Sequence, residues 1–534
     1  MNGRAAATAV ALFLAALLAR LAVAALIRFP FPEDAAYYVA AARNLAEGHG
    51  LVVDAIWSYA TPPLAFPRPA FELWQPVATL LSAGAMLVMG PSLAAAQLTG
   101  AVAGALCAPL IWAISRDATE ELALPAGRAR AVDLGSGSLG ALLGIFLMQG
   151  VTPDSAAPFT ALALLAAWLM PRALRPGPGG DAWRIALGLA VGLAYLTRQE
   201  AVYLGLAYLV SAWTQRRGPV SLTRALVVPA TIAVVVVAPW LVRQALTFER
   251  PTFGQALENA WLLRTQEVFA WAERPALARY LAAGPAHLLA LRVDGFAHNL
   301  LDVLIVPGFP AGLLGLLSLG AQPRLARLAA LRPLLVSSAL IFFVTTLVFP
   351  VSSLWGTFLH AAGPVLAVLA IATLLGLDAL VARLRRARRW RRENAWLAPF
   401  AAVTLAVPVA LLEVALLRGQ ADATAQRQAA IASVAPSWGV APGQATVIGN
   451  HPVWLSEGLG VHALALPDEP PTAILDLAGA FGATVVIVEG SAGERYPAGF
   501  APAAGELAAA CFRELPDAPA GVRAFRIVCD AAPP

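Results

Sequence analysis

Apolar runs close to twenty residues long recur along the chain, and they limit its fold more than any other feature. Of the 534 residues, 59% are hydrophobic and only 13% are charged. Soluble domains carry roughly 25% charged residues, and a helix needs about 20 apolar residues to cross a bilayer. The sequence therefore predicts a polytopic all-α membrane domain with about 11 to 13 transmembrane helices. The apolar runs between residues 76 and 114 leave that number open.

Two long polar segments and a polar tail interrupt the apolar pattern. The predicted membrane domain covers residues 1–418, with a first long loop at 28–75 and a second at 243–297. The tail, 419–534, alternates four strand-like runs with two helix-like runs: 445–449, 461–466, 484–489 and 522–529 for the strands, 473–481 and 504–511 for the helices. Such alternation predicts a small α/β domain, and we expect further helices within the loops.

The arginines orient this layout, because cytoplasmic loops are enriched in basic residues. The run of arginines within 383–392 is the strongest cytoplasmic marker. If it lies inside, the tail lies outside, and the basic loops at 171–184, 215–224 and 321–332 all fall inside. We therefore expect a cytoplasmic N-terminus, two extracytoplasmic long loops and an extracytoplasmic C-terminal domain.

Several function classes find no support in the sequence. The net charge of +5 is explained by loop arginines, and no basic stretch is interleaved with aromatics, so we expect no nucleic-acid partner. There is no phosphate-binding glycine loop and no Cys/His pattern with zinc spacing.

The chain has three cysteines, of which Cys107 lies in an apolar run. Cys511 and Cys529 lie in the tail, where a disulfide and two free thiols are both open.

Ionisable residues stand at span ends on the predicted outer side, where such groups are expensive and often functional. They follow or precede four different spans: Glu33 and Asp34, Asp154, Arg198 with Glu200, and His360. An arginine in this position suits a lipid phosphate, which its planar fork binds through two parallel hydrogen bonds. The pattern predicts one polar site built from distant parts of the chain.

Each group also has a simpler interpretation. Glu33 and Asp34 follow a proline and could only stabilise the first turn of a helix. Asp154 could be an N-cap. Arg198 and Glu200 could form a local interfacial ion pair, or the arginine could snorkel. These alternatives stay open from the residues alone.

Short motifs in a fixed order resemble those of C-type-fold integral membrane glycosyltransferases, in particular the bacterial protein-mannosyltransferase-like and aminoarabinose-transferase-like family. The motifs are Glu33-Asp34-x-x-Tyr37-Tyr38, Leu73-Trp74-Gln75-Pro76, Thr152-Pro153-Asp154-Ser155, Thr197-Arg198-Gln199-Glu200 and Gly356-Thr357-Phe358-Leu359-His360. The tail motif Val447-Ile448-Gly449-Asn450-His451-Pro452 also looks like the small extracytoplasmic domain of such proteins.

The resemblance implies inverting transfer of a sugar from a polyprenyl-phosphate donor to a lipid, glycan or protein acceptor, at the outer face of a bacterial plasma (inner) membrane. Asp34 would be the catalytic carboxylate, with Glu33 beside it. The substrate-binding residues would be Tyr38, Asp154, Arg198, Glu200 and His360. A divalent metal ion is the one cofactor it allows, with Asp34 and Asp154 as ligands. Glu200 departs from the family pattern, which has a less charged neighbour beside the arginine.

A non-catalytic transporter or lipid flippase is the alternative from another class. Such a protein is expected to carry ionisable residues near the middle of its spans, or paired broken helices. The groups singled out here stand at span ends on one side, which favours chemistry on a lipid headgroup. A degenerate homologue whose tail only binds a partner is a third interpretation.

Overall fold

The structure is a computed structural model that describes residues 3–175, 179–214, 222–248, 257–388, 395–490, 493, 496 and 511–529. Contacts along the backbone divide the chain into two compact units. The first comprises Met1–Ile27, Trp74–Val242 and Arg292–Arg418, and the second comprises Arg28–Leu73, Arg243–Leu291 and Gly419–Pro534. Each unit is described by itself.

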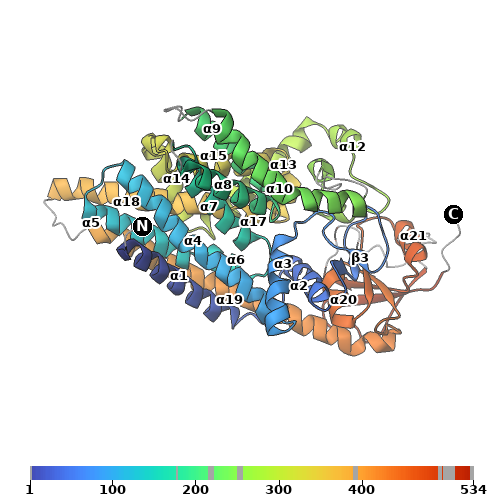
Figure 1. Cartoon of the computed structure of the whole chain (residues 1–534). Helices are drawn as coiled ribbons and strands as arrows, with labels where there is room; N and C mark the ends of the chain where they lie inside the picture. Colours follow the sequence, from blue (N-terminus) through green and yellow to red (C-terminus); the bar gives the residue numbers. More distant parts are fainter. Residues whose placement is uncertain are drawn as a thin grey trace. The chain divides into compact units, whose positions relative to one another are not determined.

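The first unit is built from helices (Figure 1). In chain order, and including helices that cross its borders, they are α1 (Gly3–Ala24), α3 (Val77–Met89), α4 (Leu93–Glu121), α5 (Ala126–Leu142), α6 (Gly144–Val151), α7 (Ala156–Ala173), α8 (Gly180–Tyr195), α9 (Val202–Thr214), α10 (Leu222–Phe248), α13 (Pro285–Ala297), the π-helix η4 (His298–Ile305), α14 (Ala311–Ala321), α15 (Arg332–Leu347), α16 (Pro350–Leu354), α17 (Thr357–Ala361), α18 (Gly363–Arg388) and α19 (Leu397–Val434).

Six helices in the described part of the chain are long and apolar enough to cross a membrane: α1, α4, α7, α10, α18 and α19. The pair α5 and α6, bent by 47°, makes a seventh span if it is counted as one. Helices α3, α14 and α15 are apolar but shorter. The polytopic all-α class is therefore confirmed, whereas the predicted total of about 11 to 13 spans is not reached by long helices alone. The second half of the predicted basic run at 383–392 lies outside the described residues.

A buried arginine holds the break between α5 and α6. Arg20 of α1 is fully buried, and its guanidinium donates hydrogen bonds of 3.2 Å to three main-chain carbonyls that flank the break, those of Gly140, Ala141 and Phe146. The carbonyls of Gly140 and Ala141 lie in the last turn of α5, where carbonyls lack intrahelical partners and lipid offers no donor to replace them. Gly150 makes room for the side chain, because a Cβ there would lie 2.6 Å from Arg20 Nε.

The second unit combines short helices with a mixed sheet. The helices are α2 (Glu33–Ala46), α12 (Leu277–Ala282), α20 (Pro452–Leu459) and α21 (Pro471–Phe481). The strands are β1 (Val52–Val53), β2 (Ala55–Ile56), β3 (Arg68–Pro69), β4 (Thr446–Gly449), β5 (His462–Ala465), β6 (Val485–Glu489), β7 (Phe512–Glu514) and β8 (Val522–Ile527). The four predicted strands and the helix predicted at 473–481 are confirmed. The helix predicted at 504–511 lies, up to its last residue, outside the described residues.

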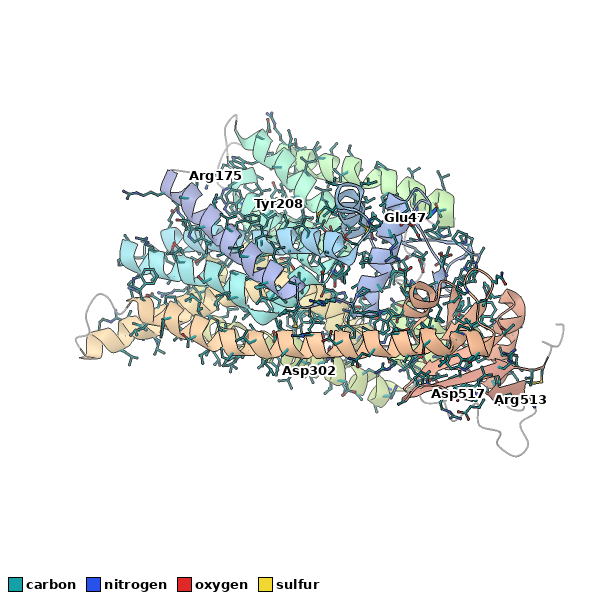
Figure 2. The ribbon with its side chains drawn as sticks, turned by 90° about the horizontal axis from the view of Figure 1, so that it is seen from below. Glu47, Arg175, Tyr208, Asp302, Arg513 and Asp517 are labelled. Carbon is teal, nitrogen blue, oxygen red and sulfur yellow. A yellow bond between two sulfur atoms is a disulfide. The ribbon has the colours of Figure 1, made fainter. Side chains whose placement is uncertain are left out.

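The larger sheet has the strand order β2-β5-β4-β6-β8-β7, parallel from β2 to β6 and antiparallel from β6 onward. Alternate residues of β6 point to opposite faces, so Val486 joins one apolar core and Ile487 the other. Cys511 and Cys529 form a disulfide, drawn in yellow beside Arg513 in Figure 2. The open question about these two cysteines is thereby resolved in favour of pairing.

Candidate functional site

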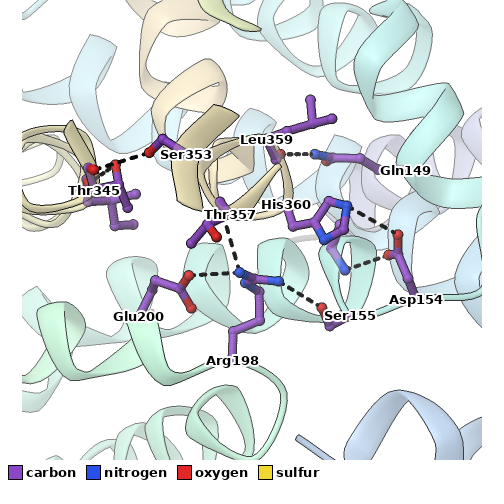
Figure 3. Close-up of polar contacts among 12 residues, drawn as sticks. Gln149, Asp154, Ser155, Arg198, Glu200, Thr345, Ser353, Thr357, Leu359 and His360 are labelled. Atoms are coloured by element: carbon purple, nitrogen blue, oxygen red, sulfur yellow. Dashed lines mark hydrogen bonds and ion pairs between the residues drawn. The ribbon is translucent and has the colours of Figure 1, made fainter. Parts of the chain in front are cut away.

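Four of the predicted site residues come together in the first unit (Figure 3). Asp154 stands between α6 and α7, Arg198 and Glu200 follow α8, and His360 lies in the short helix α17. Three separate elements thus contribute to one polar cluster, as the sequence predicts for residues at span ends.

Arg198 is the centre of this cluster. One guanidinium nitrogen, Nη1, donates to Ser155 Oγ at 3.0 Å, and Nη2 donates to Glu200 Oε1 at 2.7 Å and to the carbonyl of Thr357 at 3.3 Å. Only 11% of its side chain is exposed. Contacts from three elements therefore hold the planar guanidinium in one orientation.

Asp154 uses its two oxygens differently. Oδ1 accepts the main-chain N–H of Ala156, the first residue of α7, at 2.7 Å, although the N-cap position itself is Ser155 and not Asp154 as the capping interpretation had it. Oδ2 lies 4.0 Å from His360 Nε2. The carboxylate therefore fixes the start of a span and also faces the cluster.

His360 is held as a neutral imidazole. Burial, followed by the charge of Arg198, lowers the pKa of His360 to about 3. Its contact with Asp154 is therefore not an ion pair, and the ring offers one hydrogen-bond donor and one acceptor. Gln149 of α6 donates to the carbonyl of Leu359 at 2.8 Å, which ties α17 to the helix that leads to Asp154.

The remaining predicted residues, Glu33, Asp34 and Tyr38, lie on α2 in the second unit. Asp34 is half-buried in the first turn. Glu33 accepts hydrogen bonds from the segment that begins α20. Tyr38 is 3% exposed, with its ring 6.1 Å from that of Phe71. These residues belong to another unit than Arg198, so a single composite site stays a prediction.

The predicted metal ion also stays a prediction. Within the described ranges, no group of three or more His, Cys, Asp or Glu side chains is placed to hold a metal ion. In the first unit the candidate ligand Asp154 lies 4.0 Å from His360 Nε2. The residues described do not form a metal site, and we derive no step through a metal.

Sequence reasoning missed several members of the cluster. Ser155 belongs to a quoted motif, but a serine at a helix start is read as a cap. Thr357 acts through its main chain, and Gln149 lies within an apolar run, so neither gives a sequence signal. His451 of the tail, which contacts Glu33 at 2.9 Å, was not singled out either.

Comparisons with known proteins bear on this arrangement. Residues 68–242 match the dolichyl-phosphate-mannose-protein mannosyltransferase family. No curated protein matches the chain. The chain is similar to the crystal structure of ArnT from Cupriavidus metallidurans bound to undecaprenyl phosphate, with 15% identity and a TM-score of 0.56 over 98% of this chain and 99% of that one. It is also similar to the archaeal oligosaccharyltransferase AglB from Archaeoglobus fulgidus, in complex with an inhibitory peptide and a dolichol-phosphate, with 13% identity and a TM-score of 0.51 over 98% and 75% of the two chains.

At these identities the structural likeness shows the fold, and it agrees with the resemblance found in the motifs. The chain is a multi-pass membrane protein with the C-type fold of integral membrane glycosyltransferases, and it matches the dolichyl-phosphate-mannose-protein mannosyltransferase family over residues 68–242.

Proposed function

We propose that this protein is an inverting membrane glycosyltransferase that moves a sugar from a polyprenyl-phosphate donor to an acceptor hydroxyl. The observation that carries the proposal is the fixed guanidinium of Arg198, with Asp154 and neutral His360 in the same cluster. A similar fold, that of ArnT, is known with undecaprenyl phosphate bound. The acceptor class, lipid, glycan or protein, stays open.

On the donor side, the chemistry needs a group that stabilises a leaving phosphate. The bond between the anomeric carbon and the phosphate oxygen breaks, and polyprenyl phosphate departs with one more negative charge. A restrained guanidinium placed where this charge develops lowers the barrier without reorganising, and such contacts contribute about 100- to 1,000-fold in rate. Neutral His360 can donate one hydrogen bond to the sugar or the phosphate.

On the acceptor side, Asp34 takes the proton of the attacking hydroxyl as its oxygen bonds to the anomeric carbon. Attack from the face opposite the phosphate inverts the anomeric configuration. A general base of this kind contributes about 100- to 10,000-fold. The first turn of α2 supplies a rigid support for this carboxylate.

We further propose an extracytoplasmic site in a bacterial plasma (inner) membrane, with the N-terminus inside and the C-terminal region outside. The basic loops support this orientation, and so does the Cys511–Cys529 disulfide, since disulfides persist in oxidising compartments. The test is a fusion after residue 534 of a reporter enzyme that works only in the cytoplasm. Activity of this fusion would contradict the proposed orientation.

The test is release of polyprenyl phosphate from labelled polyprenyl-phosphate hexoses and pentoses by the purified protein, with the product anomer identified by NMR. Asp34→Asn and Arg198→Gln should each lose about 100-fold or more. Asp302→Asn is the matched control, because that carboxylate is 67% exposed on η4. Absence of turnover with every donor, or full activity in Asp34→Asn, would refute the proposal. Turnover that disappears on treatment with a chelator and returns with a divalent ion would support the predicted metal.

A further inference from the structure

The carboxylate of Glu33 is bound by the start of another helix. Glu33 is the first residue of α2, yet its Oε1 accepts the main-chain N–H of Val453 at 2.8 Å, and its Oε2 lies 2.9 Å from His451 Nδ1. His451 immediately precedes α20, so the carboxylate stands at the positive N-terminal end of that helix. Both oxygens of Glu33 therefore have partners in the C-terminal segment.

The segment before Glu33 is bound by the same helix. Trp454 Nε1 donates to the carbonyl of Pro30 at 3.1 Å, and its ring stacks on Phe31 with 5.9 Å between centroids. Near the other end of both helices, Arg43 pairs with Glu457 at 2.6 Å. Helix α20 therefore contacts α2 at both ends, and its first residues hold the turn that carries Asp34.

Charged groups from three elements face His451: Glu33 from α2, Glu489 from β6 and Arg427 from α19. Burial opposes the protonated form and Arg427 adds to this, but the hydrogen bond and charge of Glu33, with the charge of Glu489, outweigh both. The pKa of His451 is accordingly raised above its usual value. The hydrogen bond and the charge of Glu33 thus favour the protonated ring, in which Nδ1 is a donor.

We propose that His451 is a positioning residue for the reactive carboxylate, because through Glu33 it fixes the first turn of α2, which carries Asp34. This inference rests on the proposed function in taking Asp34 as the reactive group. It assigns Glu33 to anchoring instead of proton transfer. Neighbouring residues in one helical turn move together, and a displacement of about 1 Å can cost on the order of 100-fold in rate.

Kinetics of the full-length protein test the inference with the polyprenyl-phosphate sugar that it turns over. His451→Ala should lower kcat about 10- to 100-fold and leave KM for this donor unchanged. His451→Asn should recover most of the loss, since an amide nitrogen can stand near the position of Nδ1. The double variant Glu33→Gln, His451→Ala should have the same kcat as His451→Ala alone, because both substitutions remove the same contact, that between Glu33 and His451.

His462 provides the matched control. It too faces a carboxylate of the first loop, since its Nδ1 lies 3.3 Å from Asp54 Oδ1. Asp54, unlike Glu33, lies outside α2. His462→Ala should therefore leave kcat unchanged. Wild-type kcat in His451→Ala, while Asp34→Asn is inactive, would overturn the inference and leave the proposed function intact.

Hydrogen exchange provides a readout that needs no activity. In the native protein, the amide of Ala35 donates to the carbonyl of Pro32 at 3.0 Å in the first turn of α2. His451→Ala should raise exchange at residues 33–36 by about tenfold, whereas His451→Asn and His462→Ala should not. Unchanged exchange in His451→Ala overturns the anchoring role even if no donor is turned over. Absence of turnover in the wild type refutes only the proposed function.

Discussion

Replacing Glu200 by glutamine should tighten binding of polyprenyl phosphate. Glu200 is one of two places where the sequence departs from the pattern of the family it resembles, and its Oε1 accepts from Arg198 Nη2 at 2.7 Å. The two side chains are only 12% and 11% exposed. A phosphate that binds Arg198 must approach a guanidinium whose charge is already offset by this carboxylate. The amide oxygen of glutamine can still accept the same hydrogen bond, so the substitution removes charge and retains geometry.

The magnitude follows from Coulomb's law. An anion on the far side of the guanidinium lies roughly 7 Å from the carboxylate, and at an effective dielectric constant of about 20 their repulsion is about 2 kcal/mol per unit of phosphate charge. Solvent at this partly exposed pair reduces the value to about 1–2 kcal/mol, which corresponds to about 5- to 30-fold in affinity. The product carries more charge than the donor, so its affinity should rise more, and kcat should fall because product release slows.

The assay is titration of the purified protein with undecaprenyl phosphate at low and high salt, followed by product-inhibition kinetics. The gain in affinity should change little at high salt, because a pair this buried is screened much less than exposed charges. Glu120→Gln is the control, since Glu120 makes a comparable pair with Arg116 at 2.8 Å in α4 and is well exposed. Equal or weaker binding in Glu200→Gln would refute the assignment of Arg198 to the phosphate.

Three further substitutions test other parts of the structure by thermal unfolding in detergent. Because the pKa of His360 is lowered to about 3, the unfolded chain binds a proton between about pH 6.5 and 3 that the folded chain excludes. The free energy of unfolding should therefore fall as the pH drops through this window, and it should fall less in His360→Asn. The same pH dependence of unfolding in both proteins would contradict this. Gly150→Ala should destabilise by about 1–3 kcal/mol because its Cβ would meet a buried guanidinium, whereas Gly205→Ala, with open space around its Cβ, should not. Replacing Cys511 and Cys529 by serine should cost about 3 kcal/mol through the loss of an 18-residue cross-link, and an unchanged unfolding of the tail would count against the pair.

Sequence patterns predicted the elements that depend on local periodicity. The runs at 445–449, 461–466, 484–489 and 522–529 are mostly apolar, and they form β4, β5, β6 and β8. Strand β2 could not be predicted, because Ala55–Ile56 is too short to show any alternation. It pairs with β5 across some 400 positions of sequence. Packing therefore joins part of the first loop to the sheet of the tail, although each loop was predicted as an appendage of the membrane domain.

Buried polar side chains were the harder part of the prediction. Arg20 was not singled out from the sequence, where it is one arginine inside an apolar run, and such a residue can serve transport or structure. In the structure its guanidinium serves three carbonyls at the α5–α6 break, so the residue has a structural explanation. Only the three-dimensional position of those carbonyls distinguishes the two readings, and no local pattern encodes it.

Of the two interpretations of Glu33 and Asp34, helix cap or reactive acid, the structure bears only on the helix cap. Helix α2 begins after Pro32 without a side-chain cap. Glu33 does cap a helix, but that helix is α20, more than 400 residues later, where it accepts the N–H of Val453. Both oxygens of Glu33 are held by contacts with the start of α20, one from the N–H of Val453 and one from His451. The proposed proton transfer is therefore assigned to Asp34, and the proposed role of Glu33 is to fix the helical turn that carries Asp34.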